Sequence, residues 1–141
     1  MSYTIKNLSR KQLQLIQLAL ETQARLEMAQ VDHALYQVRG KNGETHVFNW
    51  ETIQQINNIV KDAIRIDRNS SWGVGFHEDT DIKVDMMQVI RHKLAWERAV
   101  EDGTVESEQS PRKFSEMMGV CYDEPMKWSK ESFIEVVNEG Q

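Results

Sequence analysis

The sequence predicts a mainly α-helical, oligomeric protein with one long N-terminal helix, two further helices and a small C-terminal β-hairpin. Apolar residues recur at helical spacing in residues 8–38 and again in residues 79–103. The tail differs, because residues 117–122 and 133–137 are short β-type runs separated by a turn-forming cluster around Pro125. With 141 residues, the chain is long enough for one hydrophobic core and too short for two comfortable domains.

We therefore expect a single domain covering residues 1–141. Its helical core is predicted at 8–103, a polar linker at 104–116, and the hairpin or clamp at 117–141. The linker prediction rests on the polar run TVESEQSPRK, in which Pro111 blocks helix continuation.

Composition narrows the class of partner. The 22 acidic residues outnumber the 17 basic ones, which gives a formal charge of −5. Non-specific nucleic-acid binders need a cationic surface that releases counterions, so this balance argues against that role and leaves a small anionic ligand open. Cys121 is the only cysteine, which excludes an internal disulfide and a cysteine-built zinc site. No apolar run reaches the ~18 residues of a membrane span, and no signal-peptide core is visible, so we expect a cytoplasmic protein.

The N-terminal helix has a well-specified start. Ser9 and Gln12 match a capping box, with Leu8 and Leu13 at the hydrophobic staple positions. Two apolar stripes then follow on opposite sides, and Gly40 is the expected end, which makes the helix about 45 Å long at ~1.5 Å per residue. The first stripe comprises Leu13, Ile16, Leu20, Ala24, Met28, Val31, Leu35 and Val38, and the second comprises Leu15, Leu18, Ala19, Leu26, Ala29 and Tyr36. A small domain cannot bury both stripes, so we expect a homo-oligomer formed through helix 8–38.

The middle of the chain predicts a second helix. Residues 41–43 are typical of a tight turn, and residues 44–48 form either a brief strand or a connector. Asn49 is a suitable cap for a helix that carries Trp50 and later apolar residues at helical spacing. A basic row lines its C-terminal half. That row, Lys61, Arg65 and Arg68, is either a solvated face or one side of an anion site.

The third helix follows a glycine-and-aromatic loop at residues 69–76, where Gly73 and Gly75 permit positive φ. We expect Asp79 or Thr80 to cap this helix and Gly103 to end it. The helix also carries three polar side chains near one face, namely Asp81, Asp85 and His92. We interpret them as a solvated face rather than a metal site, because no third ligand at a known metal-site spacing is present.

The catalytic templates that we tested do not match. HExxH and Walker motifs do not occur, Gly73-Val74-Gly75 is not a dinucleotide fingerprint, and Cys121 has no activating neighbour and is expected in the core. We therefore expect a protein that is not an enzyme and uses no cofactor or metal.

Ligand binding is the remaining chemistry. Arg91 interrupts an apolar run and is either paired with an internal acid (Asp85, Glu97, Asp123 or Glu124) or a fork-shaped donor for phosphate. Trp72 and Phe76 either stack on a base or pack beneath the loop. The predicted ligand-binding residues are Arg65, Arg68, Trp72, Phe76, Arg91, His92 and Arg98. Arg91 and Arg98 are expected to approach from another side or from a second subunit.

Three segments resemble a group of small tailed-phage proteins. They are LSRKQLQLIQLALE near the start, DMMQVIRHKLAW in the centre and YDEPMKWS near the end, which occur in the same order in that group. The similarity covers most of the chain, except residues 41–68, and implies a phage accessory protein in the host bacterial cytosol. By analogy of size, helicity and lack of a catalytic motif, phage anti-defence sponges suggest sequestration of a small anionic cyclic nucleotide signal. The alternative is a phage protein that inhibits a host protein by direct binding.

Overall fold

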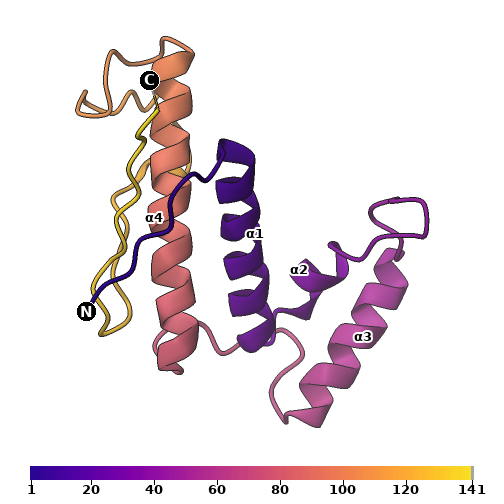
Figure 1. Cartoon of the computed structure of the whole chain (residues 1–141). Coiled ribbons are helices and arrows are strands. Elements are labelled where there is room, and N and C mark those ends of the chain that lie inside the picture. The colour runs from indigo at the N-terminus through magenta and orange to yellow at the C-terminus, as the bar shows by residue number, and fades with distance from the viewer. Residues whose placement is uncertain (141) are drawn as a thin grey trace.

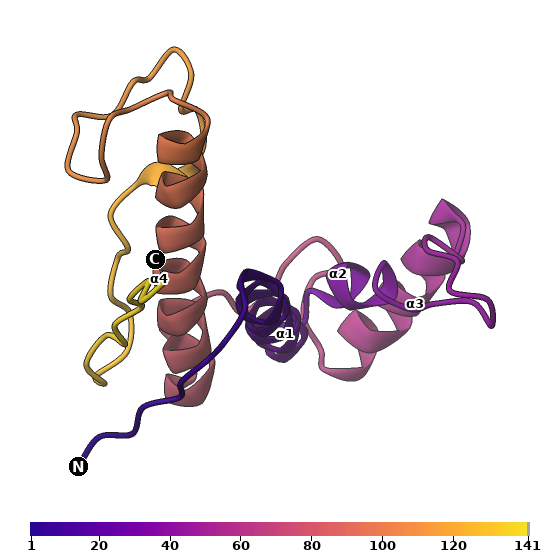
Figure 2. The ribbon, with the colours of Figure 1, turned by 45° about the horizontal axis from the view of Figure 1, so that its top comes forward.

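The computed structural model describes residues 1–140, and the regular structure in this range is helical. Four α-helices occur in the order α1 (Arg10–Glu27), α2 (Val31–Leu35), α3 (Trp50–Ala63) and α4 (Glu78–Glu101), followed by a short 3-10 turn, η1 (Val120–Tyr122). The mainly α fold class is confirmed. α1 packs along α4, whereas α2 and α3 project as an arm from the other side of α1 (Figures 1 and 2). No helix within residues 1–140 combines the length and apolar character needed to cross a membrane.

α1 begins where the sequence predicts. The Ser9 Oγ accepts a hydrogen bond from the Gln12 backbone N–H at 3.1 Å, and the Gln12 Oε1 accepts one from the Ser9 backbone N–H at 2.8 Å. One face of the helix then packs on α4, where Ala24 and Met28 are buried in a cluster with Val84. This contact forms the part of the core that joins the two longest helices.

The predicted single helix over residues 8–38 is wrong, because the chain breaks after Glu27. Ala29 adopts a left-handed conformation with φ 64°. The Gln30 N–H donates to the Arg25 carbonyl at 2.8 Å, and the Ala29 N–H donates to the Leu26 carbonyl at 3.0 Å. These two bonds make a Schellman motif, which normally places glycine at the left-handed position. Alanine is the strongest helix former, so residue type alone does not reveal this end.

The start of α3 agrees with the prediction, since the Asn49 Oδ1 accepts a hydrogen bond from the Thr52 N–H at 2.8 Å. Before it, the Gly43 N–H donates to the Gly40 carbonyl at 3.0 Å, which closes the expected turn. Residues 44–48 contain no strand and serve as a connector.

The cap of α4 lies two or three residues earlier than predicted. His77 occupies the cap position without a side-chain cap bond, and Thr80 is buried and donates instead to a Glu27 carboxylate oxygen at 2.7 Å. The end agrees with the prediction: Gly103 has φ 76°, and the Thr104 N–H donates to the Ala99 carbonyl at 2.9 Å. Because the Thr80 side chain bonds to Glu27 of α1, it does not cap α4 as predicted.

The predicted C-terminal β-hairpin is wrong, because residues 117–140 contain η1 and no strand. The tail runs along the side of α4 opposite to α1 (Figures 1 and 2). The buried Asp85 carboxylate accepts hydrogen bonds from the Trp128 N–H (2.8 Å), the Ser129 N–H (3.0 Å) and the Ser129 hydroxyl (2.6 Å). The interpretation of Asp81 and Asp85 as a solvated face is therefore also wrong. Backbone donors of the tail bond to α4 side chains, so a second strand is not needed.

The segment predicted as a polar linker, residues 104–116, has no regular structure, but its ends are packed. Val105 and Met117 are buried in a cluster with Trp96 of α4. The Arg112 guanidinium donates to the carbonyls of Met117 (2.9 Å) and Gly119 (3.1 Å). The loop is thus held against the C-terminal end of α4, while Cys121 is only half-buried.

Candidate functional site

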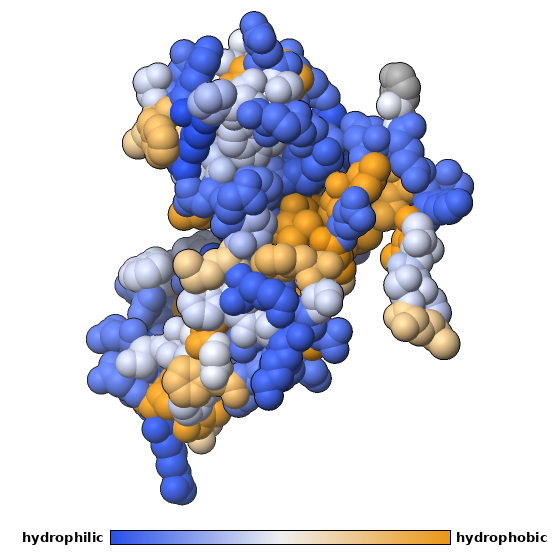
Figure 3. Space-filling view, turned by 90° about the vertical axis from the view of Figure 1, so that its left-hand side faces the viewer, coloured by the Kyte–Doolittle hydropathy of each residue, from blue (hydrophilic) through white to orange (hydrophobic). Residues whose placement is uncertain are grey.

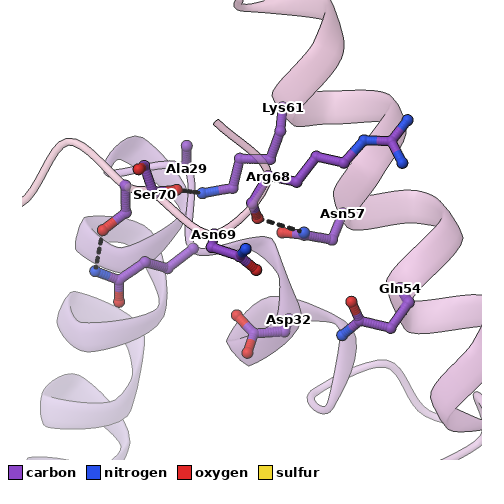
Figure 4. A pocket seen from close by; sticks show the side chains of 10 residues that line it. Ala29, Asp32, Gln54, Asn57, Lys61, Arg68, Asn69 and Ser70 are labelled. Atoms are coloured by element: carbon purple, nitrogen blue, oxygen red, sulfur yellow. Dashed lines mark hydrogen bonds between the residues drawn. The ribbon is translucent and has the colours of Figure 1, made fainter. Parts of the chain in front are cut away.

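A polar hollow of about 230 Å³ lies in the arm, between α2, α3 and the loop that follows α3 (Figure 4). Its lining combines amide, hydroxyl and charged side chains. The lining residues are Ala29, Gln30, Asp32, Gln54, Asn57, Lys61, Arg68, Asn69, Ser70 and Ser71. Such a surface offers many hydrogen-bond donors and acceptors at short range.

The loop returns beside α3 because the helix ends in a second Schellman motif. Arg65 takes the left-handed position with φ 61°, and the Ile66 N–H donates to the Lys61 carbonyl at 3.1 Å. The returning chain is then held by the Asn57 side-chain amide, which donates to the Arg68 carbonyl at 3.2 Å. Arg65 and Arg68 therefore lie beyond the helix rather than along its C-terminal half, and both are exposed.

Lys61 separates from this basic row, because only 4% of it is exposed. Its ammonium donates to the Ser70 carbonyl (Figure 4). Within residues 1–140, no carboxylate pairs with it. Buried charges are normally paired, so this cation at the hollow has an unused capacity for a negative group.

Arg68 lines the hollow and also pairs with Asp62. Its Nε lies 3.1 Å from one carboxylate oxygen of Asp62, and an NH2 nitrogen lies 2.7 Å from the other. This bidentate hydrogen bond lowers the pKa of Asp62 and raises the pKa of Arg68. Asp62 therefore holds the guanidinium in place and partly balances its charge, while Asp32 adds one negative group to the lining.

The aromatic loop adjoins the hollow. The Trp72 and Phe76 ring centroids lie 6.0 Å apart at 51°, with Trp72 half-buried and Phe76 64% exposed. The Trp72 N–H donates to the Met28 carbonyl at 3.0 Å, and the Gly75 N–H donates to the buried Asp81 carboxylate at 2.9 Å. Gly73 and Gly75 have positive φ, as expected. The loop is therefore fixed at both ends and presents an accessible aromatic ring.

The other predicted residues lie apart from this loop, on α4. Arg91 is 13 residues after Glu78, about 20 Å along the helix at ~1.5 Å per residue. His92 Nδ1 lies 3.2 Å from the Cys121 carbonyl, and its Nε2 lies 3.7 Å from Glu124. Arg98 is exposed. A single chain therefore divides the predicted set into two groups, Arg65, Arg68, Trp72 and Phe76 in the arm region, and Arg91, His92 and Arg98 on α4.

The environment of Arg91 bears on the two alternatives for this residue. Its Nε is buried, and no hydrogen-bond partner for that atom is found in the described part of the chain. The acids considered as partners bond elsewhere: Asp85 to the tail, Glu97 to Arg10 and Lys93, Asp123 to Arg112 and Glu124 to His92. The internal salt bridge is therefore not formed within residues 1–140, and the role as a phosphate donor stays a prediction.

Amide side chains of α3 were not among the predicted ligand-binding residues, although they line the hollow. Gln54, Asn57 and Lys61 have spacings of three and four residues, so they share one face of α3. This polar stripe on an amphipathic helix is visible in the sequence. Its periodicity is the signal that could have identified this part of the lining.

Known proteins give no further guide to the ligand. In comparisons with protein-family models, with curated proteins and with solved structures, nothing matches this chain. Over residues 1–140, no group of three or more His, Cys, Asp and Glu side chains is placed to hold a metal ion. The chemistry of the lining side chains is therefore the guide to what the hollow binds.

Proposed function

We propose that this protein is a non-enzymatic phage accessory protein that binds and sequesters a small anionic nucleotide, such as a cyclic nucleotide immune signal of the host. The observation that supports this most directly is the buried Lys61 ammonium, which faces a polar hollow and pairs with no carboxylate in residues 1–140. A phosphate beside it supplies the missing negative charge.

The rest of the hollow suits the other parts of such a ligand. At about 230 Å³ it is smaller than the ~300–1,000 Å³ of pockets that enclose a whole ligand. It therefore accommodates one end of a nucleotide, with Gln54, Asp32 and the side-chain oxygen of Asn57 available to the edge of a base. The remainder extends over the loop towards Trp72 and Phe76, where base stacking contributes about 1–3 kcal/mol.

The test is calorimetric titration of the protein with cyclic dinucleotides, cyclic ADP-ribose derivatives and their linear counterparts. Lys61→Met is expected to weaken binding at least tenfold without loss of stability, because methionine fills the site and removes a buried charge. Lys41→Met, at an exposed turn position, is the matched control and is expected to bind as the wild type does. Mass spectrometry after denaturation is expected to recover the ligand intact.

Two results contradict the proposal, and a third contradicts the role of Lys61 in it. A wild-type protein that binds no member of the panel, and carries none after purification, has a different function. Unchanged affinity of Lys61→Met for a ligand that the wild type binds places the site elsewhere. A marked loss of stability in this variant assigns Lys61 to holding the loop at Ser70.

A second candidate, inhibition of a host protein by direct binding, is supported by the tail. Trp128, Phe133 and Val137 are 45%, 40% and 60% exposed, and they alternate with exposed glutamates. The tail leaves an apolar hollow of about 240 Å³ against Ile82 and Met86 of α4. Apolar surface is visible in the middle of this face (Figure 3). Such a patch is typical of protein interaction sites.

The two candidates respond to different variants. Phe133→Ala is expected to reduce capture of a host protein and leave nucleotide titrations unchanged, whereas Lys61→Met is expected to do the reverse. Cross-linking of tagged wild-type and variant proteins in host lysate measures the first effect. Equal recovery of the same host protein by wild type and Phe133→Ala contradicts the second candidate.

A further inference from the structure

The outer side of α1 is a second feature that the proposed nucleotide site does not use. One side of α1 packs on α4, and the arm of α2 and α3 diverges from the other side (Figures 1 and 2). We call the side of α1 that faces away from α4 its outer side, and the space between α1 and α3 the open angle. Leu15 and Leu26 lie across the helix from Ala24, which packs on α4, and are 52% and 46% exposed. Leu18, next to them, is 38% exposed. The protein's own side chains therefore leave this stripe open.

The spacing on this side is that of a helix-pairing seam. Leu15, Ala19, Thr22 and Leu26 follow one another at intervals of four, three and four residues, which is the repeat of coiled-coil core positions. Two leucines lie at the ends and two small residues in the middle. Ala19 is exposed, whereas Thr22 is half-buried and its hydroxyl is already covered within the single chain. Small central residues allow two helix backbones to approach closely while the leucines interlock at each end.

The surface area indicates how much of the molecule is left uncovered. The chain exposes 10057 Å² for a mass of 16.5 kDa, whereas a compact monomer of this mass exposes roughly 7,500 Å². Both partners of an obligate homodimer together bury about 2,000–5,000 Å², and each contributes half of this area. The excess of roughly 2,500 Å² therefore matches the upper end of one subunit's share.

Charge favours a second copy of this chain as the occupant. The charged side chains of α1 other than Lys11 are paired within the chain, as Arg10–Glu101, Arg25–Glu21 and Lys83–Glu27. The remaining neighbours of the seam are mostly glutamines. In a dimer with a two-fold axis, the same surface of each copy contacts the other copy. Because this surface of α1 is nearly neutral, the contact causes little like-charge repulsion.

We propose that two copies pair through α1 in antiparallel orientation, with Leu15 of one copy beside Leu26 of the other and Ala19 beside Thr22. α3 then covers the second helix from the far side of the open angle. Trp50, at the start of α3, is 64% exposed and is the apolar side chain available for this contact. Within residues 1–140, α2 is the only helix that packs against α3 in the single chain. The dimer is independent of the nucleotide proposal.

The full-length protein is tested by sedimentation velocity and native mass spectrometry at micromolar concentration. The wild type is expected to be a dimer. Leu15→Glu/Leu26→Glu is expected to weaken it roughly 100-fold or more, because central interface side chains each contribute about a decade or more of affinity. Both positions are exposed, so circular dichroism is expected to show unchanged helix content. Ser115→Glu, in the exposed loop after α4, is the matched control and is expected to remain dimeric.

Cysteine cross-linking tests the orientation. In a Cys121→Ser background, a mixture of Leu15→Cys and Leu26→Cys chains is expected to give mainly the mixed disulfide. A monomeric wild type, or a dimer that survives Leu15→Glu/Leu26→Glu, overturns the proposal. The exposed leucines of α1 then do not form a contact between two copies of this chain. Preferential 15–15 and 26–26 cross-links overturn the antiparallel arrangement.

Discussion

The two sides of α1 differ in how they are stabilised. On one side, α1, α4 and the tail form a body with buried apolar residues such as Ile90 and Met117, and with ion pairs such as Lys83–Glu27. On the other, the arm of α2 and α3 buries Ile53 and Lys61, and polar bonds such as that from Asn57 to Arg68 hold its loop. Two apolar side chains of α3, Trp50 and Ile59, are 64% and 68% exposed. We therefore expect the body to be the more stable part of the chain and the arm to open at a lower free energy.

The greatest change in stability is expected from replacing a buried isoleucine by alanine, either in the body or in the arm. Ile90 and Ile53 are each 2% exposed, and an isoleucine-to-alanine change in a core costs roughly 2–5 kcal/mol. Ile90→Ala is expected to lower the free energy of unfolding of the whole chain. Ile53→Ala is expected to open the arm alone, because few contacts transmit the loss to α4.

Hydrogen exchange read residue by residue, together with urea unfolding, distinguishes the two variants. Faster exchange confined to residues 31–71 is expected for Ile53→Ala. An equal loss of protection in α4 contradicts the separation of arm and body.

An intermediate effect is expected from acid. Burial raises the pKa of Glu27, but hydrogen bonds from Lys83, Gln23 and Thr80 outweigh it and lower the pKa to about 2. The native state thus favours the charged carboxylate, and this contribution is complete above pH 4.5 and is lost as the pH falls from 4.5 towards 2. We expect the loss to be about 2 kcal/mol after allowing for partial exposure.

Denaturation of wild type and Glu27→Gln at a series of pH values measures this contribution. The variant is expected to show a flatter profile below pH 4.5, while Glu51→Gln, at the exposed start of α3, is expected to follow the wild type. Identical profiles for wild type and Glu27→Gln contradict the proposed link between the end of α1 and α4.

A smaller effect tests the joint between body and arm. Ala24 and Ala29 are both buried, but Ala24 lies within α1 and Ala29 has φ 64°. Ala24→Gly is expected to cost about 1 kcal/mol or more. Ala29→Gly is expected to be neutral or to stabilise by up to about 1 kcal/mol, because glycine relieves the left-handed strain. Thermal melts measure both, and equal losses contradict the Schellman end at Ala29.

The helix ends show how far residue type predicts this fold. Gly103 ends α4 as predicted, because glycine has no Cβ to oppose positive φ. Ala29 and Arg65 occupy the same kind of position and give no such signal. The aromatic loop and its two glycines were predictable for the same local reason. The hollow was only partly predictable, since the stripe of Gln54, Asn57 and Lys61 is periodic, whereas Asp32 and Ser70 join it through the folded chain.

Residue chemistry was sufficient to specify the helical class, the caps at Ser9 and Asn49, and the turn at Gly40–Gly43, because these depend on residues within one turn of each other. Three other features involve contacts between distant residues: the first helix ends beside the Met28 carbonyl, which accepts from the Trp72 N–H, residues 117–140 form no strand, and Asp85 is buried. The two sets differ in the range of the interactions that stabilise them. A buried carboxylate is stable when distant backbone donors reach it, and the Trp128 and Ser129 donors that reach Asp85 lie more than forty residues further along the chain.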